Sequence, residues 1–300
     1  MARLFLFAAV VVVPLVSGCA STWDTATSRG FREKPFGTMF DREDPLHTLR
    51  TVPNENGTER ARAMLKLKEP TSNGQDQAVQ EEVMQMLSTA ATSDPSPWVR
   101  VCAIDALAKF KDPRTPEILA NAYHHATGKP REPNAPPAAN PIQQASGSRE
   151  PGRYAVDRLG GLTGPQGFPA DQVANIRSRA VEGLGKTQRP EAVEFLARVA
   201  NGQEFGTNED PTTKDYVRQR AVASLGQMRQ KEAVVALNKV LTTESGKDVA
   251  LASLAHNGLK SLTGKNIPAD PEKWNGVIQT GFEIAPEPSM IQRAAATVMD

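Results

Sequence analysis

Apolar residues recur at helical spacing in a frame of 25 residues that occurs three times along the chain. The copies span Val99–Tyr123, Ile176–Ala200 and Val217–Leu241 and align without a gap. Four positions hold the same residue type in every copy, namely an Arg, an Ala and two Leu residues: Arg100, Ala103, Leu107 and Leu119; Arg177, Ala180, Leu184 and Leu196; Arg218, Ala221, Leu225 and Leu237. Self-similarity of this kind is the sequence signature of a repeat protein. We therefore expect a stack of similar helical units.

Each copy is predicted to fold as a helical hairpin, whose first helix begins just before the Arg and whose second helix occupies the later half of the frame. Pro113 and Pro190 are expected to begin the second helices, where a missing N–H costs no hydrogen bond. The apolar positions of two copies are expected to face a common core: Trp98, Val99, Ala103, Leu107, Ile118, Leu119 and Ala122; Ile176, Ala180, Leu184, Phe195, Leu196 and Val199.

Another hairpin is expected ahead of the first copy, from about Thr58. Two apolar stripes separated by a polar turn indicate it: Ala61, Met64, Leu65 and Leu67; Val79, Val83, Met86 and Leu87. Arg100 and Arg177 are 77 residues apart, whereas Arg177 and Arg218 are 41 apart, so room for a further unit is expected in the longer interval. Residues 127–151 within that interval are rich in Pro and are predicted to form a non-helical insertion.

Two variant units share a second internal pattern. One begins at Ala155 and the other at Ala255, and in both a Leu-Thr-Gly end is followed by a Pro-Ala-Asp segment. The Gly is expected to close one helix, and the Asp, Asp171 or Asp270, to cap the next. Trp274 is expected to lock the last helix onto the stack, because the ends of repeat arrays need capping.

The motif Val-Arg-x-x-Ala-x-x-x-Leu, followed by a second helix that a Pro begins, resembles HEAT repeats. The similarity is closest to the short class related to phycobilisome-lyase subunits. It implies an all-α fold, a HEAT-like α-α superhelix (solenoid) of about six helical hairpins over residues 57–281. The family includes scaffolds, adaptors and a few lyase subunits, so the resemblance predicts an architecture and leaves the activity open.

The N-terminus has the pattern of a secretory leader. Arg3 precedes an apolar run of 13 residues, Leu4–Val16, which is shorter than the about 20 residues that span a bilayer. The sequence Leu-Val-Ser-Gly-Cys that ends at Cys19 resembles the lipobox of bacterial lipoproteins. The resemblance implies cleavage after Gly18 and lipidation of Cys19, and Ala20 after it favours the outer membrane. An ordinary cleaved leader with an incidental cysteine, or no leader, is the alternative.

These patterns divide the chain into four parts. Residues 1–18 are predicted as a lipoprotein signal peptide, residues 19–56 as a flexible tether, residues 57–281 as the repeat domain and residues 282–300 as a C-terminal tail. Without the leader, 34 basic residues (35 minus Arg3) balance 34 acidic ones. This balance gives no electrostatic basis for nucleic-acid binding.

Residue types that carry chemistry are sparse. Lipidation of Cys19 would leave Cys102 as the single remaining thiol, so no intrachain disulfide is expected, and Cys102 is expected to be a bland helical residue or a partly exposed reactive thiol. His124 and His125 are adjacent, whereas two ligands on one helix face need i and i+4 spacing. No phosphate-binding loop, nucleophile elbow or paired cysteine motif is present. We expect no catalytic residues, metal, cofactor or small-molecule substrate.

Two sets of polar residues are candidates for a binding surface. The repeated Arg100, Arg177 and Arg218 are expected to bond carbonyls or acids of neighbouring repeats, with a basic row of ligand-binding residues as the alternative. In HEAT solenoids the second helices line the concave side. There the polar residues vary between copies while apolar positions stay fixed, which suits recognition of an extended partner, although a solvated helix face explains them equally: Glu117, Asn121, Glu194, Arg198 and Lys239.

The sequence therefore predicts a non-catalytic protein-binding scaffold that is lipid-anchored in a bacterial envelope, on the outer membrane facing the periplasm. The partner is an unknown protein. One alternative is an enzyme subunit similar to the HEAT-type bilin lyases. Another is a purely structural envelope protein without a dedicated partner.

Overall fold

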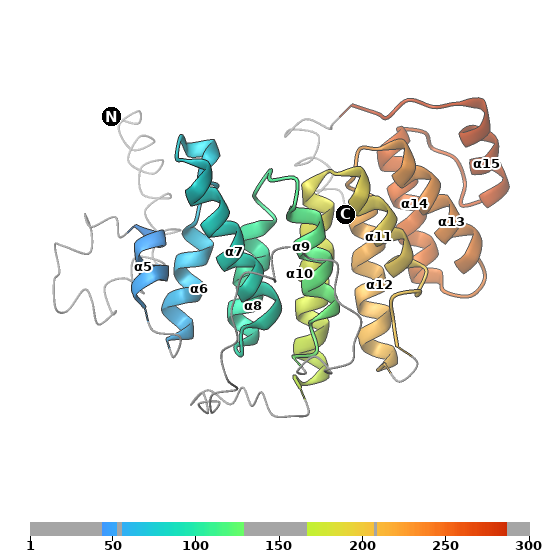
Figure 1. Cartoon of the computed structure of the whole chain (residues 1–300). Helices are drawn as coiled ribbons and strands as arrows, with labels where there is room; N and C mark the ends of the chain where they lie inside the picture. Colours follow the sequence, from blue (N-terminus) through green and yellow to red (C-terminus); the bar gives the residue numbers. More distant parts are fainter. Residues whose placement is uncertain (1–43, 53–55, 129–166, 207–208, 287–300) are drawn as a thin grey trace, which may run out of the picture. The chain divides into compact units, whose positions relative to one another are not determined.

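The computed structural model describes residues 44–52, 56–128, 167–206 and 209–286 (Figure 1). The described residues form eleven α-helices and one 3₁₀ turn. They are α5 Pro45–Thr51, α6 Gly57–Lys66, η1 Thr71–Asn73, α7 Gln77–Ser93, α8 Pro97–Leu107, α9 Thr115–His124, α10 Ala170–Thr187, α11 Pro190–Ala200, α12 Pro211–Leu225, α13 Lys231–Glu244, α14 Val249–Thr263 and α15 Pro271–Thr280. The predicted all-α fold is confirmed.

The chain divides into two compact units, residues 1–48 and 49–300. Only residues 44–48 of the first unit are described, and they belong to the start of α5. Helix α5 lies within residues 19–56, where the sequence predicted a flexible tether and no helix. The predicted leader, Cys19 and most of the tether lie outside the described residues. Within the part of the chain that is described, no helix has the length and apolar character needed to cross a membrane.

Ten helices of the second unit follow one another as five hairpins. We call α6, α8, α10, α12 and α14 the first helices, and α7, α9, α11, α13 and α15 the second helices. Each first helix packs against the next first helix, and each second helix contacts the next second helix (Figure 1). This stacking is that of an α solenoid, as predicted. Of the about six hairpins expected, the one beginning at Ala155 lies outside the described residues.

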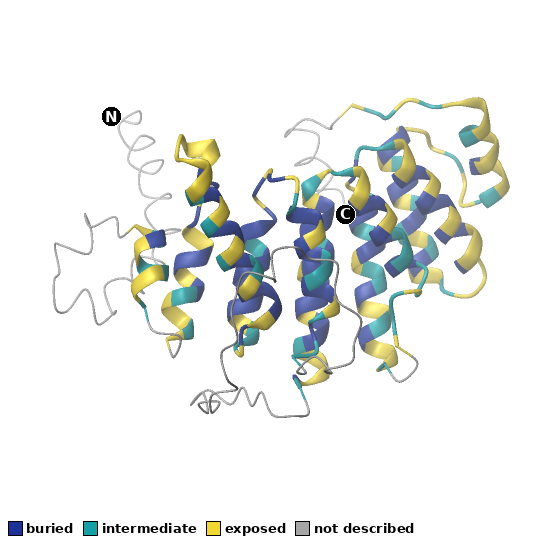
Figure 2. Cartoon of the chain, viewed as in Figure 1, coloured by how far each residue is buried: buried dark blue, intermediate teal, exposed yellow. Residues whose placement is uncertain are grey.

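The core lies between these two rows of helices, where buried positions of first and second helices face each other (Figure 2). The repeated Leu107, Leu184 and Leu225, and their counterparts on the second helices, are all at most 1% exposed. The predicted core positions of both copies are buried, apart from Trp98, which is 54% exposed. In the hairpin ahead of them, Met84 is buried where Met86 was expected, and Leu65 is exposed.

Glycines on the first helices allow neighbouring helices to approach closely. A Cβ on Gly185 would lie 2.8 Å from the Cβ of Ser224, and a Cβ on Gly258 would lie 2.9 Å from a methyl carbon of Leu237. Gly183 likewise faces the Leu119 side chain at 3.2 Å. These glycines serve close packing, and any side chain there would push two helices apart.

The predicted helix ends are partly confirmed. Pro190 begins α11 and Gly264 closes α14 in the left-handed conformation. The Asp270 carboxylate accepts hydrogen bonds from the first turn of α15, as predicted. Two predictions were wrong. Pro116, not Pro113, lies in the first turn of α9, and Asp171 lies inside α10, whose N-cap is Pro169.

The last helix is locked as expected. Trp274 is fully buried, its indole N–H donates to the carbonyl oxygen of Pro268 at 3.0 Å, and its ring meets that of His256 edge-on. Beyond α15, the N–H of Ala285 donates to the carbonyl oxygen of Leu262 at 2.8 Å. The final described residues of the chain therefore return to the end of α14 and cover the last hairpin.

The predicted further unit does not interrupt the stack between α9 and α10. These two helices pack directly, and α8 also packs on α10. Residues 129–166, which contain most of the predicted 127–151 insertion, lie outside the described residues. Their flanking residues, Gly128 and Gly167, are held together by a hydrogen bond between their neighbours Thr127 and Phe168. The hairpins α8–α9 and α10–α11 are therefore direct neighbours in the stack.

Candidate interaction surface

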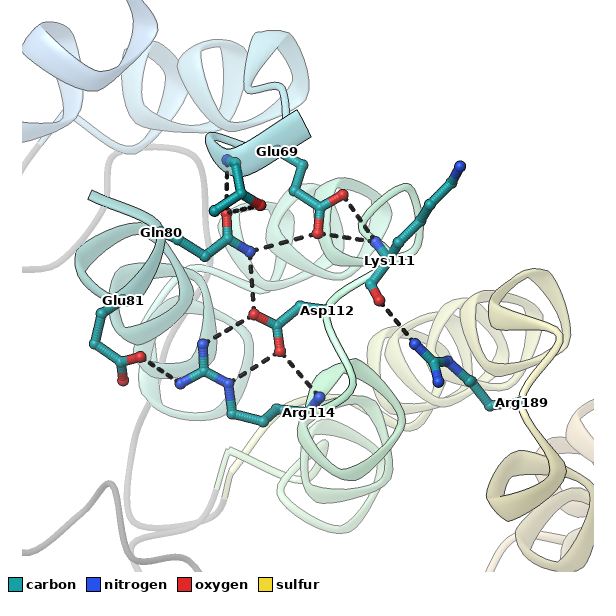
Figure 3. Close-up of polar contacts among 8 residues, drawn as sticks. Glu69, Gln80, Glu81, Lys111, Asp112, Arg114 and Arg189 are labelled. Carbon is teal, nitrogen blue, oxygen red and sulfur yellow. Dashed lines mark hydrogen bonds and ion pairs between the residues drawn. The ribbon is translucent and has the colours of Figure 1, made fainter. Parts of the chain in front are cut away.

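The starts of the second helices are fixed by a buried polar network at the turns within the hairpins (Figure 3). The Gln80 side-chain amide donates to the Asp112 carboxylate at 3.0 Å and to Glu69 at 3.4 Å. Glu69 accepts the main-chain N–H of Lys111, whose carbonyl oxygen accepts a hydrogen bond from Arg189 at 2.9 Å. Three successive turns are therefore joined in one network.

Asp112 is the centre of this network. Arg114 donates to both of its carboxylate oxygens, at 3.0 and 2.9 Å, and reaches Glu81 on α7 at 2.6 Å. Burial by itself raises the pKa of Asp112, but the hydrogen bonds from Arg114 and Gln80 and the charge of Arg114 outweigh it and lower that pKa to about 2. Asp112 is thus ionised at neutral pH and holds α7 and α9 in register.

The opposite ends of the second helices are joined by the repeated arginines. Arg100 is buried, and its guanidinium donates to the carbonyl oxygen of Asp94 at the end of α7 and to that of His125 at the end of α9, at 2.7 and 2.6 Å. Burial lowers the pKa of Arg100 to about 10 against the opposing effect of Asp94, so it remains charged at neutral pH. Helix C-termini carry unpaired carbonyls and negative dipole ends, which a cation satisfies.

Arg218 repeats this arrangement one step further along the stack. It donates to the carbonyl oxygen of Ala200, the last residue of α11, at 3.0 Å and pairs with Glu244, the last residue of α13. Arg177 differs, because it pairs with Glu209 and lies over the Tyr123 ring with 4.9 Å between guanidinium carbon and ring centroid. Arg100 and Arg218 thus join the ends of second helices, and Arg177 contacts the last turn of α9 through Tyr123, which supports the predicted structural role of all three.

A fourth arginine of this kind was missed. Arg60 on α6 pairs with the carboxylate of Asp94, whose carbonyl oxygen is bound by Arg100. The signal was present in the sequence, because Arg60, Ala63 and Leu67 have the spacing of the repeated Arg-x-x-Ala-x-x-x-Leu frame. The longer turn after α6 broke the alignment of the second half of the frame.

Between these two fixed ends, the second helices expose the five predicted residues. Glu117 and Lys239 are exposed, and Asn121 is half-buried. Glu194 and Arg198 are brought together in an ion pair of 2.9 Å, and Arg198 also binds Glu204 at 2.6 Å. Arg198 is therefore partly neutralised by its own neighbours. The side chains of Glu117, Asn121 and Lys239 make no hydrogen bond or ion pair with any other described side chain.

An exposed apolar residue accompanies this polar set. Val235 on α13 is 50% exposed and occupies the position that Glu117 and Glu194 occupy in the other two copies. Sequence analysis did not name Val235, because it compared only the polar residues of the second helices. Apolar residues at the centre of a polar surface are common contact points in protein interfaces. The chemistry of the second-helix surface therefore changes between copies: one position of the frame is acidic in two copies and apolar in the third, and the other is polar in one copy and basic in two.

Cys102 and His124 are among the described residues that sequence analysis considered for reactive or metal-binding roles. Cys102 is 1% exposed, so the alternative of a partly exposed thiol is wrong. Burial, aided by Asp105, raises the pKa of this thiol to about 11, which disfavours the reactive thiolate at neutral pH. His124 lies 3.9 Å from Glu204, and burial lowers its pKa. Within the described ranges, no three His, Cys, Asp or Glu side chains lie close enough to hold a metal ion.

Comparison with known families gives one match. Residues 217–243, which cover the later part of α12 and nearly all of α13, match the model of the PBS lyase HEAT-like repeat. The chain carries a HEAT-like repeat. The hairpins α8–α9 and α10–α11 share the Arg, Ala and Leu positions of this HEAT-like repeat and stack in the same way. No curated protein and no solved structure matches the chain.

Proposed function

We propose that this protein is a non-catalytic scaffold that binds a protein partner through the second helices of its HEAT-like hairpins. One observation carries the proposal. Glu117, Glu194 and Val235 occupy equivalent exposed positions on α9, α11 and α13, whereas the Leu two residues further along is buried in every copy. A surface that changes chemistry from unit to unit on a constant frame suits an extended partner with a defined sequence.

Site-specific photocrosslinking tests the scaffold. A photoreactive amino acid at Glu117 or Lys239 is expected to capture the same protein from envelope extracts, because both positions lie on second helices. The same label at Ser253, which is exposed on the first helix α14, is the matched control. Reproducible absence of a captured protein from Glu117 and Lys239, or equal capture from Ser253, would count against the scaffold.

The second part of the proposal is a lipid anchor at Cys19. Its support is the sequence, namely the basic start, the apolar run and the Leu-Val-Ser-Gly-Cys motif. Several acyl chains bury many methylenes at about 0.8 kcal/mol each, so anchoring in the envelope would be effectively permanent. Cys19→Ser is expected to abolish fatty-acid labelling and membrane fractionation, with Cys102→Ser as the control. A Cys19→Ser protein that still sediments with membranes would exclude the anchor.

One observation favours a second candidate, a subunit of the bilin-lyase type. The family matched by residues 217–243 bears the name of a lyase repeat. Incubation of the purified protein with a tetrapyrrole separates the two candidates. A saturable absorbance shift would favour the lyase-type subunit, whereas an unchanged spectrum is the result that the scaffold predicts.

A further inference from the structure

The first helices α10 and α12 enclose a small polar groove that the proposed function does not use. Its volume is about 130 Å³, and its lining is formed by Glu182 and Lys186 of α10 and by Arg220, Ala223, Ser224 and Gln227 of α12. The close approach of Gly185 to Ser224 makes the floor shallow and small, while long polar side chains form the walls. The groove holds a few water molecules or one side chain, not a folded domain.

Positive charge predominates at this groove. Glu182 lies 3.3 Å from Arg220 and 3.5 Å from Arg179, so two arginines share one carboxylate. Lys186 forms no ion pair with any other described residue. Three cations and one anion therefore meet here, and the surplus positive charge favours an additional carboxylate.

Arg220 is held ready for such a ligand by Tyr216. Its guanidinium carbon lies 5.1 Å from the centroid of the Tyr216 ring, and its Nη2 group donates to the Tyr216 hydroxyl at 3.3 Å. Tyr216 is itself 41% exposed. Stacking on an aromatic ring already restricts the arginine side chain, so less conformational entropy is lost when it binds a ligand. Arg and Tyr are also enriched among the residues that dominate protein interfaces.

The existing partner of Arg220 is easily exchanged. The side chains of Arg220 and Glu182 are 46% and 27% exposed, and ion pairs exposed to this degree contribute little to stability. An incoming carboxylate can bind Arg220 and Lys186 together while Glu182 turns to Arg179. A planar guanidinium binds a carboxylate with two parallel hydrogen bonds.

We infer that the groove between α10 and α12 binds an acidic side chain of an extended protein segment. This surface lies on first helices and is separate from the second-helix surface of the proposed scaffold. The two surfaces share no residue. Failure of peptide binding at the groove can therefore be distinguished from failure of photocrosslinking at the second helices.

Binding of a fluorescein-labelled oligoglutamate peptide to the full chain, followed by fluorescence anisotropy, tests the inference. Lys186→Gln and Arg220→Gln are each expected to weaken binding by at least about threefold, the scale of one exposed ion pair. Lys231→Gln removes the same charge from the start of α13 and is expected to leave binding unchanged. Circular dichroism melting of each variant confirms that it folds.

Glu182→Gln is expected to change peptide binding in the opposite direction from Lys186→Gln and Arg220→Gln. Removal of the competing carboxylate is expected to tighten peptide binding, whereas Glu232→Gln, which changes the net charge equally on α13, is not. The inference would be overturned if oligoglutamine bound as well as oligoglutamate, if Lys186→Gln and Lys231→Gln weakened binding equally, or if Glu182→Gln and Glu232→Gln had the same effect.

Discussion

The main-chain N–H of Phe168 donates a 2.8 Å hydrogen bond to the carbonyl oxygen of Thr127, although the two residues are 41 positions apart. Helix α9 ends just before this bond and α10 begins just after it. The described residues on either side of residues 129–166 therefore meet at one point. A short turn would join the two hairpins equally well.

Excision of residues 130–165, with a short Gly-Ser linker in their place, is expected to preserve cooperative thermal unfolding. The free energy of unfolding is expected to rise by up to about 2 kcal/mol, because closing a shorter loop loses less chain entropy. Urea titration followed by circular dichroism measures it. Loss of cooperativity or a fall in the free energy of unfolding would mean that the excised residues contribute packing to the stack.

Gly128 is required at the same junction. Its φ is +66°, and a Cβ there would lie 2.8 Å from the Phe168 ring. Gly128→Ala is expected to lower the free energy of unfolding by about 2 to 3 kcal/mol, because left-handed backbone strain of about 1 to 2 kcal/mol adds to the steric clash. Gly74 has a similar φ of +77° and open space around its Cα, so Gly74→Ala is the control for strain alone. Equal losses in the two variants would exclude the clash.

The repeat frame predicted the core well, because apolar residues that recur at helical spacing lie on the one face of a helix that packs inward. Leu119, Leu196 and Leu237 recur at one position, and each is fully buried. Trp98 shows the limit of periodicity. It lies in the first turn of α8, where the pattern points inward, yet it is 54% exposed.

Sequence spacing alone does not distinguish an extra unit from a long connection. The 77 residues between Arg100 and Arg177 suggested another hairpin, whereas α8 packs directly on α10. The groove at Arg220 was also unpredictable, because it depends on how closely Gly185 approaches Ser224. By contrast, the five predicted residues of the second helices follow from the repeat frame, and none of them is buried.

The arginines that join helix ends should not tolerate lysine. Arg218 bonds the carbonyl oxygen of Ala200 and the carboxylate of Glu244 from different nitrogens. A lysine has one charged nitrogen at the end of a flexible chain and cannot bridge both groups with the same geometry. Arg218→Lys is expected to lower the free energy of unfolding by about 2 kcal/mol, the scale of a buried hydrogen bond to a charged group.

Arg220→Lys is the matched control, because Arg220 lies on the same helix and is 46% exposed. Its effect on thermal unfolding is expected to stay within about 0.5 kcal/mol. Similar melting temperatures for the Arg218→Lys and wild-type proteins would contradict the bridging role.

Asp112 gives the turn network a defined pH dependence. Its pKa is about 2 in the folded protein, below the ordinary value of 3.8, so the unfolded chain takes up a proton first as the pH falls. The stabilisation is therefore complete above about pH 4 and is lost as the pH falls towards 2. At neutral pH, Asp112→Asn is expected to lower the free energy of unfolding by about 2 kcal/mol, a figure reduced for the partial exposure of Arg114.

Urea unfolding of both proteins across the acid range measures this difference. It is expected to be largest at neutral pH and to shrink between about pH 4 and pH 2, because the wild type then loses the same charge. Asp215→Asn, at an exposed position of α12, is the control for loss of a carboxylate outside the network. If the difference between wild type and Asp112→Asn instead stayed constant across this range, hydrogen-bond geometry and not the charge of Asp112 would hold the turns of α7 and α9 together.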